Sequence, residues 1–125
     1  MIIGLGIDLV DVLDLQSDLD QQKEKLLHRL FTPIELDYCS SQADPYQSFA
    51  GTLAAKEATM KAFGTGWTDD VDWQDIEVVR EPSGKPMLVL KGKLLDISKR
   101  ANVKTSFLSL THTPRYANAI VILEG

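Results

Sequence analysis

The chain has 125 residues and a formal net charge of -5, with 44% hydrophobic and 25% charged residues. This length and composition predict a single folded domain over residues 1–125. The acidic balance argues against a nucleic-acid binder that works through a basic face. With only one cysteine, Cys39, the chain has no internal disulfide and no zinc site of the multi-cysteine kind, which favours the reducing cytoplasm.

The first apolar stretch, Ile2 to Val10, predicts a β-strand that is buried on both faces. Gly4 and Gly6 would let a neighbouring segment or a ligand approach its backbone closely. Asp8 lies inside this strand, where a carboxylate needs a partner, so it is either an ion-paired residue or a metal ligand. The stretch has no basic flank and no cleavage-like tail, and we expect neither a signal peptide nor a membrane span.

The next segment, residues 11–30, is more polar and predicts a helix from about Asp20. Its basic residues form either a solvent-facing surface or a docking face for an acidic partner; they are Lys23, Lys25, His28 and Arg29. A second helix should begin at Thr32-Pro33-Ile34-Glu35, which combines an N-cap, a proline at the first helical position and a capping-box acid, and run to about Cys39.

A long, alanine-rich helix is predicted up to Phe63, preceded by the start signal Asp44-Pro45. Glu57 and Lys61 are four residues apart and therefore neighbours on one helix face, with the acid before the base, which is the favourable order. Gly64 has the position of a helix C-cap. Thr65 and Gly66 extend it into a turn whose backbone N–H groups either close the helix or approach an anion.

The remaining segments predict a hairpin, a helix and two further strands. The hairpin pairs residues 75–80 with 86–91, the helix covers 91–101, and the strands cover 105–111 and 117–123. His112, at the end of a strand beside two threonines, is either a structural histidine or a phosphate donor. The fold expected from these elements is α+β, a small antiparallel sheet packed on the long central helix.

Four segments occur in the order and approximate spacing of one family, and together they cover essentially the whole chain. They read GLGIDLV, LAAKEATMKAFGTG, DIEV followed by GKP, and LSLTHTPRYANAIVILE. The sequence resembles the holo-acyl-carrier-protein synthases, the small bacterial type of 4'-phosphopantetheinyl transferase. That family transfers the phosphopantetheine arm of coenzyme A to a serine of an apo acyl carrier protein and releases adenosine 3',5'-bisphosphate.

The resemblance implies a role for each matching residue. Asp8 and Glu57 match two carboxylates that bind Mg²⁺, an ion that commonly takes one or two protein carboxylates together with substrate phosphates. Glu57 would also accept the serine proton, and Lys61 would stabilise the phosphates. The residues implied to contact coenzyme A are Lys61, Gly64, Thr65, Gly66, Lys85, Pro86, His112 and Thr113, the last two within the segment Ser109 to Thr113.

The resemblance also implies a homotrimer with active sites at subunit interfaces, and carrier docking through Lys25 and Arg29. Two positions depart from the family, because Asp14 and Thr52 stand where arginines usually serve carrier docking and cofactor phosphate binding. Each lost charge-assisted contact could cost about 1.5–3 kcal/mol. The alternative, which the missing arginines favour, is a non-catalytic module that binds coenzyme A or a carrier protein. The retained set of Asp8, Glu57, Lys61 and His112 favours the enzyme.

Overall fold

The computed structural model describes residues 1–64 and 70–125. In chain order its elements are β1 (Ile2–Asp11), α1 (Val12–Gln22), α2 (Glu24–Leu30), α3 (Pro33–Ser40), α4 (Pro45–Phe63), a 3₁₀ turn (Trp73–Asp75), β2 (Ile76–Arg80), β3 (Pro86–Leu90), α5 (Gly92–Arg100), β4 (Thr105–His112) and β5 (Tyr116–Glu124).

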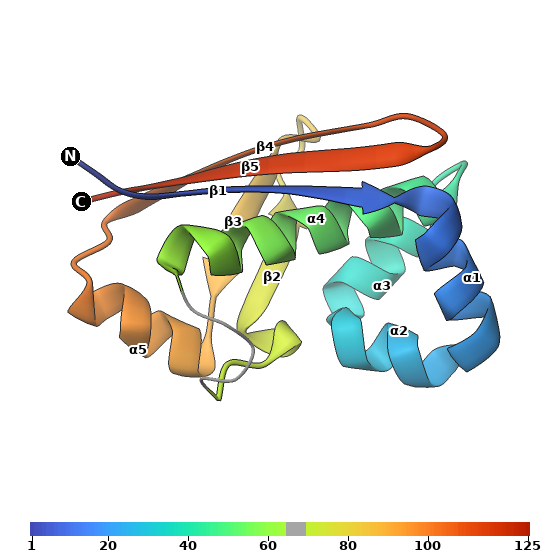
Figure 1. The fold of residues 1–125 in the computed structure, drawn as a ribbon, viewed down its shortest axis with the longest axis horizontal. Helices are drawn as coiled ribbons and strands as arrows, with labels where there is room; N and C mark the ends of the chain where they lie inside the picture. Colours follow the sequence, from blue (N-terminus) through green and yellow to red (C-terminus); the bar gives the residue numbers. More distant parts are fainter. Residues whose placement is uncertain (65–69) are drawn as a thin grey trace.

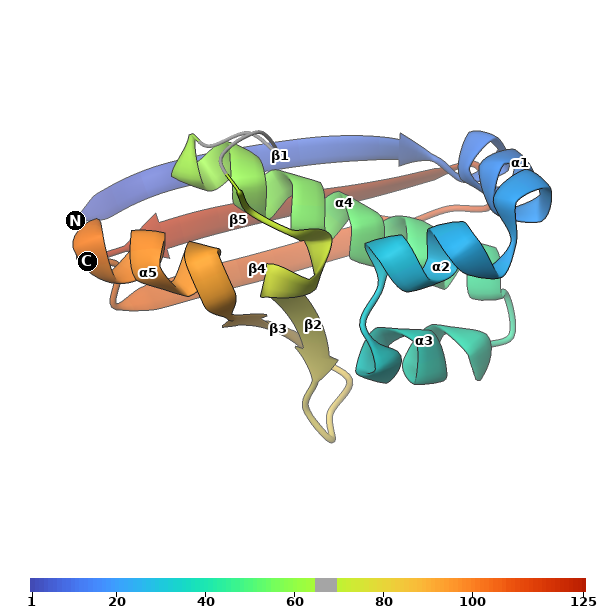
Figure 2. The same ribbon diagram turned by 90° about the horizontal axis from the view of Figure 1, so that it is seen from below.

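One layer of the molecule is a three-stranded antiparallel sheet in the order β1-β5-β4. The long helix α4 lies along one face of this sheet, against β1 and β5 (Figures 1 and 2). β2 and β3 form a separate hairpin, and β3 lies beside β4. Helices α1, α2 and α3 gather near the start of α4, whereas α5 lies toward its other end (Figure 1). The α+β prediction, with an antiparallel sheet on a long helix, is confirmed.

Small residues allow α4 to lie very close to β1. A Cβ atom added at Gly6 would overlap the carbonyl oxygen of Ala58, and one added at Gly4 would overlap that of Ala62. The close approach predicted from these two glycines is therefore made by the helix backbone itself. Fully buried alanines of α4 share one core with fully buried residues of β5; they are Ala50, Ala54, Ala55, Ala58, Ala117, Ala119, Val121 and Leu123.

The predicted helix ends are confirmed by their hydrogen bonds. Thr32 and Glu35 form the expected capping box at the start of α3. The Asp44 side chain accepts a hydrogen bond from the backbone N–H of Gln47, 3.3 Å away, and so caps α4. Gly64 ends α4 in the left-handed conformation, with φ of 68°. Within the described ranges no helix combines the length and apolar composition needed to cross a membrane.

The prediction that β1 is buried on both faces is wrong for the single chain. Its inner face packs on α4, but Leu5, Ile7 and Leu9 on the outer face are 60%, 58% and 62% exposed. An apolar run predicts a strand with both faces buried. It does not indicate whether the residues that bury each face come from the same chain.

The helix expected from about Asp20 begins earlier, at Val12. The cause is Asp11, whose Oδ1 accepts hydrogen bonds from the backbone N–H groups of Leu13 and Asp14 at 3.0 and 3.1 Å and so caps α1. Lys23, with φ of 50°, separates α1 from α2. Lys25 and Arg29, the basic residues proposed for docking, therefore lie on α2, a helix separate from α1.

Candidate functional site

Asp8 lies on the inner face of β1, where it meets Lys61 of α4. Its Oδ1 is 2.9 Å from the Lys61 Nζ atom, which also donates to the Ile7 carbonyl oxygen at 3.1 Å. The carboxylate is 10% exposed and the lysine side chain is 58% exposed, so the pair lies at the edge of the core. The hydrogen bond to Asp8 raises the pKa of Lys61, which therefore stays positively charged at neutral pH.

Glu57, one helical turn before Lys61, completes a group of three ionisable residues. Its pKa is raised from 4.5 to about 8, firstly by burial, then by a hydrogen bond with the Asp8 carboxyl and by that group's negative charge; Lys61 opposes the shift. At neutral pH the Glu57 carboxyl therefore retains its proton in the metal-free protein. Because Glu57 ionises beside Asp8 only at a cost in free energy, a cation bound between them would stabilise the two carboxylates.

The geometry around Asp8 fits a divalent metal ion. Its second oxygen, Oδ2, is buried and has no well-aligned hydrogen bond within residues 1–64 and 70–125. In the same part of the chain, no group of three or more His, Cys, Asp and Glu side chains gathers. A pair of carboxylates is sufficient for Mg²⁺, which takes its remaining ligands from water and phosphate oxygens. Asn118 of β5 holds the strand beside this pair, because its Nδ2 donates to the Asp8 carbonyl oxygen at 2.9 Å.

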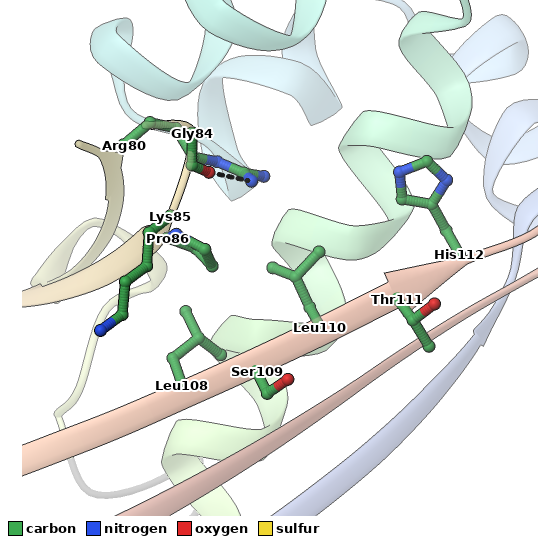
Figure 3. Close-up of a pocket in the computed structure, with 9 residues that line it drawn as sticks. All are labelled: Arg80, Gly84, Lys85, Pro86, Leu108, Ser109, Leu110, Thr111 and His112. Atoms are coloured by element: carbon green, nitrogen blue, oxygen red, sulfur yellow. Dashed lines mark hydrogen bonds between the residues drawn. The ribbon is translucent and has the colours of Figure 1, made fainter. Parts of the chain in front are cut away.

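A second group of predicted site residues lines a pocket of about 520 Å³ between the β2–β3 turn and β4 (Figure 3). Lys85 and Pro86 come from the hairpin and His112 from the end of β4, and Arg80 joins them at the end of β2. None of the nine described residues that line the pocket is acidic. In a chain whose net charge is -5, this local surplus of positive charge suits an anion.

The two groups lie at opposite edges of one sheet. Asp8 belongs to β1 and His112 to β4, with β5 between them. The family resemblance implies that Asp8 and His112 belong to one site. In the single chain, however, they lie on different edge strands of the sheet. The carboxylate pair and the basic pocket are therefore separate features of the chain.

Other predicted contact residues have simpler surroundings. The Thr113 hydroxyl accepts hydrogen bonds from the backbone N–H groups of Arg115 and Tyr116 at 3.2 and 3.0 Å, and so closes the β4–β5 turn. Gly64 lies at the end of α4, beyond Lys61. The proposed contacts of Thr65 and Gly66 lie outside the described residues.

The structure shows the surroundings of Thr52 and Asp14, the two residues that depart from the family pattern. The Thr52 hydroxyl donates to the Ser48 carbonyl oxygen at 2.9 Å, and the side chain is buried beside Cys39. Asp14 is exposed on α1. Neither position presents a positive charge, whereas Lys25 and Arg29 are exposed on α2, as a docking surface requires.

Arg80 and Gln47 lie beside predicted site residues, and the sequence analysis did not single them out. The Arg80 guanidinium lies over the Tyr38 ring, 4.6 Å from its centroid, and faces the pocket of Lys85. The position of Arg80 could have been predicted from the sequence, because an antiparallel hairpin with its turn at Gly84 places Arg80 opposite Pro86. Gln47 contacts His112, but 65 residues separate the two, and no local pattern connects them.

A buried ion pair between Lys56 and Glu35 was also missed. Both side chains are almost fully buried, and Lys56 also donates to the Leu30 carbonyl oxygen at 2.7 Å. Burial raises the pKa of Glu35 and lowers that of Lys56, and their mutual attraction opposes both shifts. Glu35 also accepts from the backbone N–H groups of Thr32 and Val78 at 2.9 and 2.7 Å, so the pair ties α3, β2 and α4 together.

Comparison with known proteins identifies the family of the chain. The family model of the 4'-phosphopantetheinyl transferase superfamily matches residues 4–121. A holo-[acyl-carrier-protein] synthase of Koribacter versatilis is 44% identical over 124 residues, which cover 99% of both chains. The crystal structure of the Neisseria meningitidis synthase has a TM-score of 0.91 at 27% identity and full coverage of both chains.

The Helicobacter pylori synthase, crystallised in complex with coenzyme A, has a TM-score of 0.84 at 28% identity and covers 96% of this chain and 99% of that one. These matches extend over nearly the whole sequence and the whole fold, so the resemblance found in the four motifs is confirmed. The chain belongs to the 4'-phosphopantetheinyl transferase superfamily, among the holo-[acyl-carrier-protein] synthases.

Proposed function

We propose that the chain transfers the 4'-phosphopantetheine arm of coenzyme A to a serine hydroxyl of an apo acyl carrier protein. The observation that carries the proposal is the meeting of Asp8, Glu57 and Lys61 where β1 crosses α4, in a chain of this family. These residues offer negative charge for a metal ion and positive charge for a diphosphate within one small region.

In the reaction the serine oxygen attacks the phosphorus that carries the pantetheine arm. A new P–O bond forms, the bond to the second phosphate of coenzyme A breaks, and adenosine 3',5'-bisphosphate leaves with the electron pair. Glu57 accepts the serine proton as the general base, once it has lost the proton that burial and Asp8 favour in the metal-free protein. Lys61 places its ammonium group beside the phosphate oxygens and stabilises the charge that develops there.

Magnesium dependence is part of the proposal. Asp8 and Glu57 would hold the ion, supported by the Asp8 Oδ2 atom, which has no well-aligned hydrogen bond in the described part of the chain, and by the cost of ionising Glu57 beside Asp8. When bound, Mg²⁺ would neutralise the diphosphate and polarise its P–O bonds. Glu57 must lose its proton when the metal ion binds, so we expect metal affinity to rise with pH.

Coenzyme A would occupy the region between the carboxylate pair and a basic pocket. Lys85, Pro86, His112 and Arg80 line that pocket, which offers its cations to phosphate oxygens. Lys61, Gly64, Thr65, Gly66 and Thr113 complete the proposed contacts. The Helicobacter pylori relative in complex with coenzyme A supports this choice of ligand.

A homotrimer would join the two halves of the site. The carboxylate pair lies at the β1 edge and the pocket at the β4 edge, so an edge-to-edge arrangement of subunits would bring one pair next to a neighbour's pocket. The outer sheet face supports association, since Leu5, Ile7 and Leu9 lie beside Ile120 and Ile122 in the paired strands.

The carrier would dock on α2 through Lys25 and Arg29, whose charges suit an acidic partner. We place the reaction in the cytoplasm, a location that suits the free thiol of Cys39. The acidic α1 next to this surface, with Asp14 at an exposed position, would weaken docking of a strongly acidic carrier.

Mass spectrometry of an apo carrier protein incubated with the enzyme, coenzyme A and Mg²⁺ tests the proposed function. We expect the carrier to gain about 340 Da, the mass of the transferred arm, with no gain when the metal is chelated. The absence of a shift with every carrier from the same cell, together with measurable binding of coenzyme A, would favour the non-catalytic binding module instead.

Sedimentation of an Ile7→Glu variant tests the trimer. Ile7 is 58% exposed in the single chain, so we expect the variant to remain folded but to sediment as a monomer and to lose transfer activity. Ile34→Glu is a matched control, because Ile34 is 54% exposed on α3, away from the sheet. A wild-type protein that sediments as a monomer while transferring the arm would contradict the shared site.

A further inference from the structure

His112 is the last member of a chain of hydrogen bonds that runs from Asp44, the N-cap of α4, through Gln47. The Gln47 Nε2 atom donates to Asp44 Oδ2 at 2.8 Å, and the Gln47 Oε1 atom is 2.8 Å from His112 Nδ1. An ionised aspartate only accepts hydrogen bonds, so the NH₂ group of Gln47 must face Asp44. Its oxygen must then face the histidine.

The orientation of the glutamine amide decides which nitrogen of His112 is protonated. An amide oxygen only accepts, so Nδ1 must carry a hydrogen in order to donate to Gln47. A neutral imidazole has a single N–H, and its other nitrogen, Nε2, then has a lone pair. Figure 3 shows the other edge of the ring turned toward the side of the pocket where Arg80 lies.

A phosphate oxygen is also an acceptor, so it is repelled by the lone pair of Nε2. His112 can bind phosphate only after Nε2 takes up a second proton, and the imidazolium then makes a charge-assisted hydrogen bond. We infer that Gln47 is a positioning residue that, held by Asp44, keeps one proton on His112 Nδ1, so that phosphate binding in the pocket requires uptake of a second. This inference rests on the proposed function, which supplies coenzyme A as the phosphate ligand.

Charged and titratable groups face the ring from several elements. Arg80 and Lys85 line the same pocket, and Asp44 lies beyond Gln47. Tyr38 of α3 also lines the neighbouring hollow. On the remaining sides the ring edge lies near Gly51 of α4, and its strand partner on β5 is Ala117, neither of which titrates. The incoming phosphate adds negative charge beside the ring, and this charge favours uptake of the second proton.

The first test measures the tautomer in the whole protein without ligand. Long-range ¹H–¹⁵N correlation NMR of wild type at high pH should show the neutral His112 ring protonated on Nδ1. In Gln47→Met the acceptor is lost, and the proton should move largely to Nε2. Gln21→Met, a change of an exposed glutamine on α1, should leave the His112 signals unchanged. A wild-type ring protonated on Nε2 would overturn the inference whatever the enzyme does.

The second test measures coenzyme A binding by calorimetry across pH. Above the pH at which the ring loses its second proton, wild type should bind about tenfold more weakly per pH unit, with uptake of a proton on binding. Gln47→Met should flatten this dependence to about threefold or less per unit, because its neutral ring can donate from Nε2. Gln47→Glu should shift the weakening to higher pH, since its carboxylate favours the imidazolium.

The outcomes separate this inference from the proposed function. If wild type binds coenzyme A equally at all pH values, the proton linkage is wrong and the proposed function stands. If wild type binds no coenzyme A at any pH, the proposed function fails, and the ligand assigned to this pocket fails with it. With 3'-dephospho-coenzyme A, a flat profile would assign the linked proton to the ribose phosphate, and a retained slope would assign it to the diphosphate; both support the linkage.

Discussion

The two lysines of α4 that make side-chain ion pairs enter groups with opposite character. Lys56 and Glu35 are almost fully buried, and the acid accepts two backbone hydrogen bonds besides the lysine. Lys61 is more than half exposed, and its partner Asp8 keeps one oxygen without a well-aligned hydrogen bond in the described part of the chain. The protein itself provides every partner described for the first group, whereas the Asp8 oxygen of the second group is open to a ligand.

This difference separates a structural ion pair from a binding site. A buried ion pair with every polar atom satisfied holds elements in place and has nothing to offer a substrate. In the second group, burial and Asp8 make ionisation of Glu57 costly, and the exposed Lys61 ammonium lies beside them. An added cation would stabilise the two carboxylates, and an anion would pair with the ammonium. The same helix therefore provides both the frame and the proposed chemistry.

The largest expected effect comes from breaking the unsatisfied group. Glu57→Gln should lower transfer by a factor on the order of 10³ or more, because it removes the proposed base and a metal ligand together. The loss should be in kcat, measured by mass spectrometry of the carrier, with the circular dichroism spectrum unchanged. Activity near that of wild type with Mg²⁺ present would show that both assignments are wrong.

Breaking the satisfied pair should affect stability. Lys56→Met leaves Glu35 buried without its partner, which should cost about 3–5 kcal/mol in the free energy of unfolding. Urea denaturation measures this loss. Lys93→Met is the control, since Lys93 is exposed on α5 and should change stability by less than about 0.5 kcal/mol. Equal stability of the two variants would contradict the structural role of the pair.

A smaller effect distinguishes the two groups by pH. Folding raises the pKa of Glu57 from 4.5 to about 8, so the folded metal-free protein binds more protons than the unfolded chain between these values. The stability that Glu57 contributes is present below about pH 4.5 and is lost as pH rises to about 8. Glu57→Gln should match wild type near pH 4.5 and exceed it by about 1–3 kcal/mol at pH 8.5 in chelator. Urea denaturation at the two pH values measures this, and a variant less stable at pH 8.5 would contradict it.

The smallest effect concerns charges outside both groups. Asp14→Arg on exposed α1 should lower the KM for an acidic carrier by about two- to fivefold at low salt, the size expected of an exposed charge contact. The gain should vanish at high ionic strength. An unchanged KM at low salt would show that α1 lies outside the docking surface.

The sequence predicted what depends on local patterns and on the family motifs. The capping box at Thr32, the C-cap at Gly64 and the close approach at Gly6 follow from residue types at fixed spacing, and the structure confirms them. The meeting of Asp8 with Glu57 and Lys61 required the resemblance, because strand and helix periodicity do not show which elements touch.

The sequence could not predict contacts between distant segments or the cover of the outer sheet face. Glu35 pairs with Lys56 in addition to capping α3, and Gln47 contacts His112, which lies 65 residues further along the chain. The apolar run of β1 suggested burial on both sides, but Leu5 and Ile7 remain exposed in one chain, since the pattern is the same whether the cover is part of this chain or a second copy.

Calorimetric titration of Mg²⁺ into the protein in the presence of coenzyme A tests the central claim most directly. We expect saturable binding to wild type and to Glu124→Gln, a control at an exposed position of β5, and no detectable binding to Glu57→Gln or Asp8→Asn. Binding of Mg²⁺ to Glu57→Gln or Asp8→Asn with the affinity of wild type would show that the carboxylate pair does not hold the metal ion.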